Sequence, residues 1–365
     1  MDWRRWIFRT TRHLDYVLLS LLLVCLAAGL LVLFSATGQD AGRVMSQALN
    51  ILLALVLMWA VANVPPQHLL RLAPFAYGLG LLLLVAVALF GEVSKGARRW
   101  LDLGLTRIQP SELMKIAVPL MLVWYLDRHE KLLRLRDFGL AGLILLLPVG
   151  LIAKQPDLGT ALLIAASGFY VLFLAGLGWG VILGLFVAAA AAMPLAWSLL
   201  HDYQRQRVLT LLDPSQDPLG AGYHIIQSTI ALGSGGVLGK GWLKGTQAHL
   251  DFLPERHTDF IFAVLGEEFG LVGILVLLLL YLAIIGRGLI IAANAPSLFG
   301  RLMAGSVTLT FATYAVVNMG MVSGLLPVVG VPLPLVSYGG TAMVTLLLGF
   351  GILMSVATHR RLVKT

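Results

Sequence analysis

The chain has 365 residues, of which 59% are hydrophobic and only 12% are charged, and its formal net charge is +8. A soluble domain carries about 25% charged residues, so this composition excludes an ordinary soluble protein and indicates several membrane-spanning segments. The basic residues are scattered between apolar runs and form no basic face, which argues against a nucleic-acid partner. Cys25 is the single cysteine, so a disulfide framework and a cluster of thiolate metal ligands are also excluded.

Apolar runs of about 20 residues, the length that crosses a bilayer, predict ten transmembrane helices. In chain order they lie near residues 14–36, 45–63, 70–91, 111–126, 137–154, 158–176, 178–199, 260–286, 302–323 and 340–358. The first run is too long for the core of a signal peptide, so we interpret it as a retained helix. We therefore expect an all-α polytopic membrane protein with a single domain over residues 1–365.

The basic residues suggest how the chain is oriented. Four of them precede the first run, and by the positive-inside rule they hold the N-terminus in the cytoplasm. Ten crossings return the C-terminus and the basic 127–136 segment to the same side. On this topology 14 of the 26 basic residues lie inside, and 12 lie outside or in the outer half of a span. Either the outer charges are tolerated because early helices fix the topology, or the outer face attracts an anion.

One connection, residues 200–258, is long, and long connections are either disordered or functional. It keeps aromatic and aliphatic residues, and its glycines cluster at 233–241, which indicates a structured extracytoplasmic loop with tight turns. Residues 223–232 within it predict an amphipathic helix at the membrane interface.

The long loop ends in LPERHTDF, directly before the eighth span. Thr258 is a candidate N-cap, which would place Asp259 in the first helical turn. Two interpretations of Asp259 remain open at this point. An acid in the first turn stabilises a helix through the helix dipole. Alternatively, Asp259 is a functional carboxylate, because it lies where a polar loop meets the bilayer beside His257.

Glu267 and Glu268 follow within the same span, about 12 Å deeper than Asp259 at 1.5 Å per residue. Two adjacent carboxylates are costly in lipid, so they must face protein or water. A helix from 258 to 286 would be about 43 Å long, which is more than one simple crossing needs. We therefore predict a break near Gly266 or Gly270, with 259–267 as a short entry helix.

Further polar residues lie on the same side of the membrane, in segments 95–100 and 109–115. Ser111 is a candidate cap of the fourth span. Glu112 and Lys115, three residues apart, share one face of that helix. They form either a structural ion pair or a contact with substrate.

Two other segments add to this outer polar cluster. Residues 154–160 join two spans, and Asp157 there is a candidate N-cap. Residues 332–340 form a Pro- and Gly-broken re-entrant piece before the last span, a kind of backbone that is tolerated at membrane depth only beside protein or water. Four outer elements can thus surround one polar cleft. The sequence has no phosphate-binding Walker loop, dinucleotide fingerprint, zinc spacing of histidines or G-x-S-x-G string.

Five strings of this sequence resemble the SEDS family of bacterial cell-wall polymerases (shape, elongation, division, sporulation). They are KGARRW at 95–100, QPSELMK at 109–115, KQPDLGTA at 154–161, FLPERHTDFIFAVLGEE at 252–268 and PLPLVSYGG at 332–340. The resemblance covers essentially the whole chain in order, and the family also has ten spans. The short termini and the Arg in LPERHTDF resemble RodA, the elongation member, more than FtsW, the division member.

The resemblance implies a peptidoglycan glycosyltransferase that polymerises lipid II at the outer face of the cytoplasmic membrane, for cell elongation and rod shape. The essential acid of the family corresponds to Asp259. An α-linked donor that becomes a β-1,4 glycan requires inversion, for which one carboxylate acting as general base is sufficient. The departing diphosphate needs cations. The residues expected to bind substrate are Lys115, Glu112, Arg205, Arg207, Arg98, Arg99, Trp100, Asp157, His257, Thr258 and Ser337.

The resemblance also implies cofactors and partners. We expect a divalent cation, Mg or Mn, and no organic cofactor. The expected partners are lipid II, the glycan linked to undecaprenyl diphosphate, a class B penicillin-binding protein (a transpeptidase) and other membrane proteins of the elongation complex. A lipid II flippase, an FtsW-type division polymerase and a scaffold are the alternatives. Unusual polar groups gather on one side only, which favours an enzyme over a flippase. A scaffold would not explain Glu112 and the adjacent Glu267 and Glu268 within the membrane.

Overall fold

The computed structural model describes residues 12–94, 97–102, 107–129, 133–199, 202–217, 220–249, 252–253 and 255–359. The long helices are α2 (Tyr16–Ala36), α3 (Ala41–Ala62), α4 (Pro66–Phe90), α5 (Pro110–Arg128), α6 (Leu135–Lys154), α7 (Leu158–Leu174), α8 (Trp179–Leu199), α12 (Ile261–Ala293), α13 (Leu298–Val322) and α14 (Gly340–Thr358). The shorter elements are α9 (Asp202–Leu212), η1 (Pro214–Gln216), α10 (Ala221–Ser234), α11 (Thr246–His249), β1 (Glu92–Ser94), β2 (Ala97–Asp102) and β3 (Arg107–Ile108).

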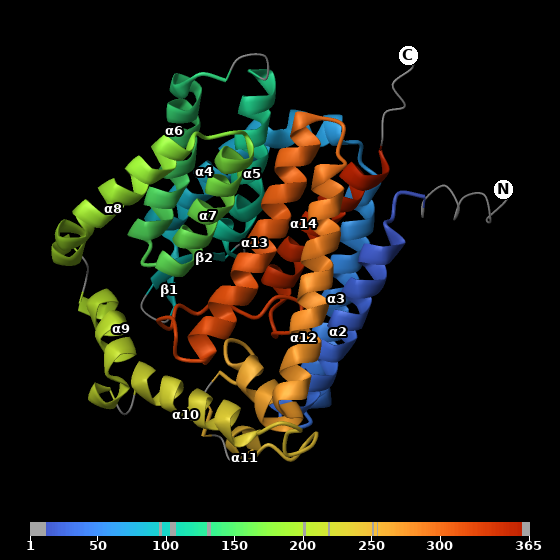
Figure 1. The fold of residues 1–365 in the computed structure, drawn as a ribbon, viewed down its shortest axis with the longest axis vertical. Helices are drawn as coiled ribbons and strands as arrows, with labels where there is room; N and C mark the ends of the chain where they lie inside the picture. The colour runs from blue at the N-terminus through green and yellow to red at the C-terminus, as the bar shows by residue number, and fades with distance from the viewer. Residues whose placement is uncertain are drawn as a thin grey trace.

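Each of the ten predicted apolar runs forms one helix, and these helices make up the bundle in Figure 1. Within the described residues, seven of them are long and apolar enough to cross a membrane. Helix α5 falls outside this group because it carries four charged side chains, while α7 and the apolar part of α8 are shorter. The helical bundle is thus confirmed, and the count of ten crossings is approximate.

Helix α2 shows how the two ends of the bundle are arranged. Asp15 caps its first turn by accepting a hydrogen bond from the Leu18 N–H and also pairs with Arg287, near the end of α12. At the other end of α2, the Ser35 hydroxyl donates to Glu268, near the start of α12. The rings of His13 and His359 stack with centroids 4.0 Å apart, so the two ends of the described chain meet. The 200–258 loop lies at the opposite end of the bundle (Figure 1).

Helix α12 is broken at Gly270, one of the two positions predicted from its length. Gly270 has a φ of +62°, and a Cβ there would lie 2.3 Å from the Gly239 backbone nitrogen. The loop backbone bonds across the break: the Lys240 N–H donates to the Glu267 carbonyl and the Leu271 N–H to the Gly236 carbonyl, both at 3.0 Å. Only glycine tolerates this φ and this close approach of the Gly239 backbone. The glycine at position 270 therefore permits the break in α12.

The described residues of the 200–258 loop are structured, as predicted, and form a layer across the lower end of the bundle in Figure 1. Helix α10 contains the predicted 223–232 helix, whereas α9 and α11 were not predicted. The segment between α13 and α14, residues 323–339, contains no helix, and its Leu333, Leu335 and Val336 are buried. The predicted re-entrant piece therefore exists as irregular backbone inside the protein.

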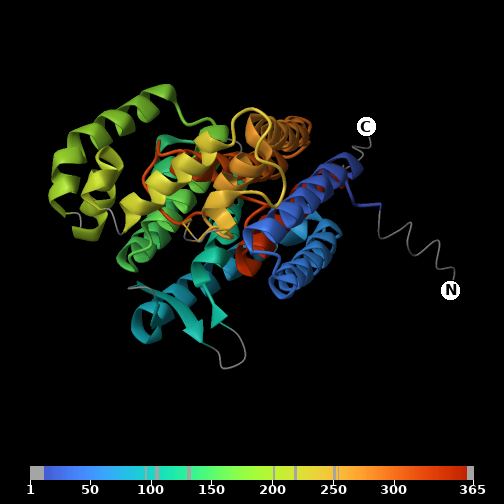
Figure 2. The ribbon, with the colours of Figure 1, turned by 90° about the horizontal axis from the view of Figure 1, so that it is seen from below.

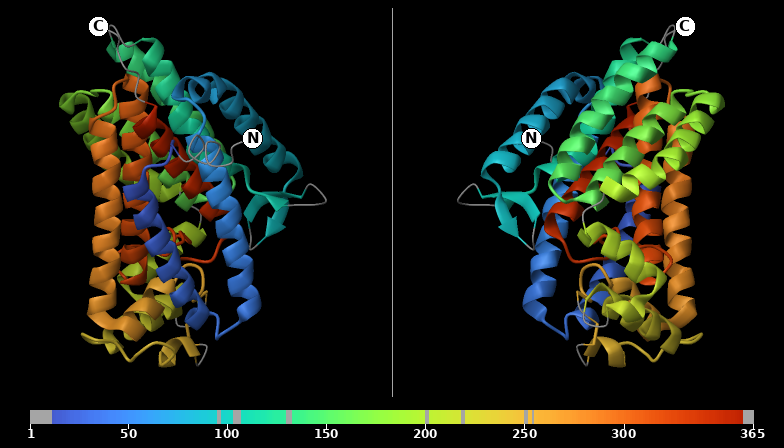
Figure 3. Two further views of the ribbon diagram at one scale, coloured as in Figure 1. Left: turned by 90° about the vertical axis from the view of Figure 1, so that its right-hand side faces the viewer. Right: turned by 90° about the vertical axis from the view of Figure 1, so that its left-hand side faces the viewer.

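A small antiparallel sheet, in the order β1-β2-β3, is the main departure from an all-α fold. It projects from the side of the bundle next to α4 (Figures 2 and 3). Strands β1 and β3, with three and two residues, are too short for the alternation of apolar and polar residues that predicts a strand, and the six residues of β2, ARRWLD, do not alternate. Lys95 and Gly96 of the predicted polar segment lie outside the described residues, as do the basic residues at both ends of the chain other than Arg12.

Candidate active site

Asp259 lies in the turn before α12, where that turn meets α13 and the 323–339 segment. The Asn318 amide of α13 donates to the backbone carbonyls of Asp259 at 2.8 Å and Val331 at 2.7 Å. A Cβ on Gly330, which has a φ of +72°, would lie 3.4 Å from Asp259 Oδ2. Asn318 thus joins the residue that carries the carboxylate to the segment facing it.

The two residues before Asp259 are fixed by the same segment. The Ser337 hydroxyl donates to the Thr258 carbonyl at 2.5 Å and accepts from the Leu333 N–H at 2.8 Å. The Tyr338 N–H donates to the His257 carbonyl at 2.9 Å, and the two rings lie edge to face with centroids 5.9 Å apart. His257, Thr258 and Ser337 therefore come together as predicted, and their contacts hold the backbone beside Asp259.

Two capping predictions are wrong. Helix α12 begins at Ile261, so Asp259 precedes the helix, and the Thr258 hydroxyl donates to Glu255 instead of capping α12. Residues 255–260 form a tight turn, so they do not extend α12 toward its N-terminus. Ser111 lies inside α5, which starts at Pro110, because proline is favoured in the first helical turn.

Glu112 and Lys115 form the predicted ion pair on one face of α5, with 2.5 Å between Nζ and Oε1. They line a pocket between α5, α13, α14 and the 323–339 segment. Lys115 Nζ lies 5.1 Å from the centre of the Tyr314 ring. Among the described residues, Glu112 Oε2 is a buried atom without a hydrogen-bond partner. Buried polar atoms of this kind are costly unless a ligand or water completes them.

Helix α13 connects the pair to Asp259. Tyr314 and Asn318 are four residues apart, so they share a face of α13, about 6 Å apart along the axis. Tyr314 lies against Lys115, and Asn318 holds the backbone of Asp259. Lys115 of α5 and the backbone of Asp259, in the turn before α12, thus contact successive turns of α13.

Asp157 caps α7, as predicted, by accepting from the Thr160 N–H at 3.4 Å. Its Oδ2 lies 3.8 Å from Arg99 Nε and accepts from the Gln109 amide at 3.3 Å. Arg99 also donates to the Pro156 carbonyl at 2.6 Å. The predicted segments around 99, 109 and 157 therefore meet, and Asp157 already has two partners there.

The remaining predicted cations have other surroundings. Arg205 of α9 donates to the carbonyls of Trp197 and Ser198, at 3.0 and 2.7 Å, and thereby caps the end of α8. Arg207 lies two residues further along α9. Arg98 and Trp100 lie on β2, and the side chain of Arg98 is outside the described part of the chain. The structure gives Arg205 a capping role, and a substrate contact remains a prediction for these residues.

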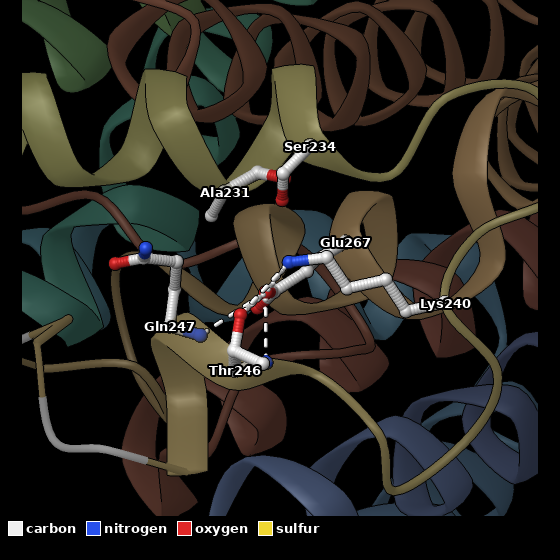
Figure 4. A network of polar contacts seen from close by, with 6 residues as sticks. All are labelled: Ala231, Ser234, Lys240, Thr246, Gln247 and Glu267. Atoms are coloured by element: carbon white, nitrogen blue, oxygen red, sulfur yellow. Dashed lines mark hydrogen bonds and ion pairs between the residues drawn. The ribbon is translucent and has the colours of Figure 1, made fainter.

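Glu267 is 0% exposed and faces the long loop (Figure 4). Its Oε1 accepts from Lys240 Nζ at 2.6 Å, from the N–H and hydroxyl of Thr246 at 2.8 and 3.0 Å, and from the Gln247 N–H at 3.0 Å. The prediction that this carboxylate faces protein or water is confirmed. Its contacts fasten the loop to α12.

His224 of α10 lies next to the site. Its ring stacks on Phe260, the neighbour of Asp259, with centroids 5.4 Å apart and 13° between the planes. Burial lowers the pKa of His224 below its usual value of 6.5, although the charges of Glu255 and Asp217 oppose this shift. The neutral imidazole is therefore favoured against Phe260.

No three His, Cys, Asp or Glu side chains gather into a metal site within the described residues. Mg²⁺ needs few protein ligands when a substrate supplies phosphate oxygens.

The sequence interpretation missed Asn318 and Tyr314. Both lie within an apolar span, where an amide is costly unless it faces protein. Their spacing of four residues, which puts both polar groups on one face, was the signal that could have revealed them.

Known proteins are similar to this chain over nearly its whole length. The profile of the FtsW/RodA/SpoVE family, described as "Cell cycle protein", matches residues 13–362. The peptidoglycan glycosyltransferase MrdB of Escherichia coli (strain K12) is 56% identical over 353 residues, which cover 96% of this chain and 95% of that protein.

Two solved structures have the same fold. A chain from a structure described as "Structural coordination of polymerization and crosslinking by a peptidoglycan synthase complex" matches with a TM-score of 0.81 and 37% identity, covering 94% of this chain and 97% of that one. The rod shape determining protein RodA of Thermus thermophilus matches with a TM-score of 0.73 and 32% identity, covering 95% and 98%.

Proposed function

Because the chain belongs to the FtsW/RodA/SpoVE family, we propose that it is a peptidoglycan glycosyltransferase that polymerises lipid II into β-1,4-linked glycan strands for cell shape. The observation that carries this proposal is the placement of Asp259 and Lys115 along one face of α13. A general base and a cation for a leaving diphosphate are the two groups that the reaction needs.

In this mechanism Asp259 accepts the proton of the 4-hydroxyl of an acceptor N-acetylglucosamine. The hydroxyl oxygen attacks the anomeric carbon of the donor sugar from the face opposite the diphosphate. The bond to the diphosphate breaks, and undecaprenyl diphosphate leaves with the electron pair. One displacement converts the α linkage into a β linkage, so a single carboxylate is sufficient.

Lys115 stabilises the negative charge that develops on the diphosphate. Glu112 fixes the ammonium group through the 2.5 Å contact, while its Oε2 is buried without a hydrogen-bond partner among the described residues. The carboxylate of Asp259 or that of Glu112 would be the protein ligand of a Mg or Mn ion. Such an ion adds positive charge at the leaving group.

The chain is a multi-pass protein of the bacterial inner membrane, like the relatives it matches. We place both termini in the cytoplasm and Asp259 at the outer face. The stacking of His13 on His359 supports a common side for the termini, and the long loop lies at the other end of the bundle. A class B penicillin-binding protein is the proposed partner, since one matched chain comes from a complex of polymerization and crosslinking.

Purified protein supplied with lipid II and Mg²⁺ tests the activity. We expect glycan strands that a β-1,4 muramidase digests, with release of undecaprenyl diphosphate, and a lower rate after chelation of the metal. The same protein in vesicles should not accelerate the movement of lipid II between leaflets. Lipid movement without polymer would instead identify a flippase and overturn the proposal.

A further inference from the structure

The side chain of Gln47 lies on α3, within an apolar span, and is only 1% exposed. Both polar atoms of its amide bond to the re-entrant 323–339 segment. The Nε2 atom donates to the Ser337 carbonyl at 3.3 Å, and the Oε1 atom accepts from the Gly339 N–H at 3.2 Å. An amide within a span is costly unless it faces such partners, so these bonds explain why Gln47 points into the protein.

The same stretch of backbone bonds on its other side to the turn before α12. The Ser337 hydroxyl and the Tyr338 N–H donate to the carbonyls of the two residues that precede Asp259. Residues 337–339 therefore connect α3 to this turn through hydrogen bonds in both directions. A shift of these three residues would displace the backbone that carries the carboxylate.

The re-entrant segment is strained just before this connection. Leu335 has a φ of +64°, a conformation that residues other than glycine rarely adopt and that persists only where the surroundings hold it. Helix α2 packs closely here, since a Cβ on Gly29 would lie 2.7 Å from the Leu335 carbonyl oxygen. From α12, the Tyr281 hydroxyl donates to the Pro334 carbonyl at 2.6 Å. Gln47 adds the hold from α3, so three helices keep the strained backbone in place.

We propose that Gln47 is a positioning residue for the general base, because it holds residues 337–339 and, through them, the turn that carries Asp259. Gln47 itself touches no reacting atom. The inference rests on the proposed function, since it gives Gln47 a part in the reaction proposed for Asp259. Loss of both amide bonds should slow the chemical step and leave substrate binding unchanged, because small displacements of a base are costly.

A pair of matched variants tests this role. Gln47→Leu removes both hydrogen bonds and keeps a side chain of similar size. Ser355→Ala is the control, because the buried Ser355 hydroxyl donates to the Val64 carbonyl beyond the opposite end of α3. With lipid II as substrate, Gln47→Leu should lower kcat about tenfold at unchanged KM. Ser355→Ala should lower the unfolding temperature and keep kcat. Equal values of kcat in the two variants would overturn the inference.

A third variant tests the hydrogen bonds themselves. The protonated form of Gln47→Glu keeps one donor and one acceptor, whereas the ionised form has no donor for the Ser337 carbonyl. At low pH, where the new carboxyl is protonated, kcat of Gln47→Glu should therefore exceed that of Gln47→Leu. A kcat as low as that of Gln47→Leu at every pH would overturn the role assigned to the amide.

Hydrogen exchange of residues 255–260 tests the coupling without turnover. The Thr258 and Phe260 amides bond within this turn, so they should exchange faster in Gln47→Leu than in the wild type and at the wild-type rate in Ser355→Ala. Unchanged exchange in Gln47→Leu would overturn the inference. Wild-type protein that makes no polymer from lipid II would instead overturn the proposed function, and the exchange rates would still decide whether Gln47 holds the turn.

Discussion

Two Glu–Lys pairs in this molecule have nearly the same geometry and different surroundings. Glu112–Lys115 lie three residues apart on α5, with 2.5 Å between their charged atoms. Glu267–Lys240 are 27 residues apart and lie 2.6 Å from each other, between α12 and the long loop. The first pair lines a cavity, whereas the second is surrounded by loop backbone.

The two pairs therefore differ in what surrounds them more than in the ion pair itself. In each pair the second carboxylate oxygen has no hydrogen-bond partner among the described residues. That of Glu112 belongs to a cavity wall. That of Glu267 lies against Gly245, where even a Cβ would be only 3.0 Å away. We therefore propose substrate contact for the α5 pair, whereas the hydrogen bonds of the α12 pair attach the loop.

Replacing the lysine of each pair should separate the two roles most strongly. Lys115→Met removes the cation proposed to stabilise the diphosphate and should lower kcat/KM by about 10²–10³-fold. Lys240→Met removes only a loop contact and should lower it by less than about tenfold. Initial rates of polymerisation measure both variants. Equal falls in kcat/KM for the two variants would contradict the proposal that only the α5 pair contacts substrate.

Asn318 tests whether the backbone of Asp259 must be held in place. Asn318→Ala removes both donated hydrogen bonds and should lower kcat by about 10²-fold with little change in KM, since small displacements of a base are costly. Thr308→Ala on the same helix is the matched control, because that buried hydroxyl donates only to its own helix. Comparable losses of kcat in both variants would contradict a positioning role for Asn318.

Glu267 should affect stability more than chemistry. Glu267→Ala leaves Lys240 and two loop amides without their acceptor and should cost about 3–5 kcal/mol of folding free energy. Glu267→Gln keeps an acceptor oxygen and should cost less. Thermal unfolding in detergent and hydrogen exchange of residues 240–247 measure these effects. Unchanged exchange in Glu267→Ala would show that the carboxylate does not fasten the loop.

The smallest expected effect is the pH dependence that His224 contributes. Its pKa is lower in the folded protein than in the unfolded chain, so its contribution to stability is fully present above pH about 6.5 and is lost as pH falls through the folded pKa. His224→Gln should lose less stability than the wild type between pH 7.5 and 5.5, as followed by thermal unfolding. Identical losses would exclude His224 as a source of this dependence.

Most of the bundle could be predicted from the sequence, because a bilayer imposes a minimum length on each apolar run. The break at Gly270 followed from the same arithmetic, since α12 was too long for one crossing. The Glu112–Lys115 pair followed from helical spacing. These predictions depend only on local periodicity.

The features that were missed depend on contacts between distant parts of the chain. Lys240 reaches Glu267 only because the loop folds back across the break in α12. Asn318 reaches Asp259 only because the 323–339 segment turns back into the bundle. The wrong helix start at Thr258 has a similar cause, because the turn that precedes α12 is held by the re-entrant Ser337 rather than by a local cap.

Asp259→Asn tests the central claim, that this carboxylate is the general base, most directly. The variant keeps the size of the side chain and the backbone contacts of Asn318, so its fold should be unchanged. With purified protein and lipid II, the initial rate of glycan formation should fall by about 10³-fold or more, with an unaltered unfolding temperature. A rate within about tenfold of the wild type would contradict the assignment of Asp259 as the base.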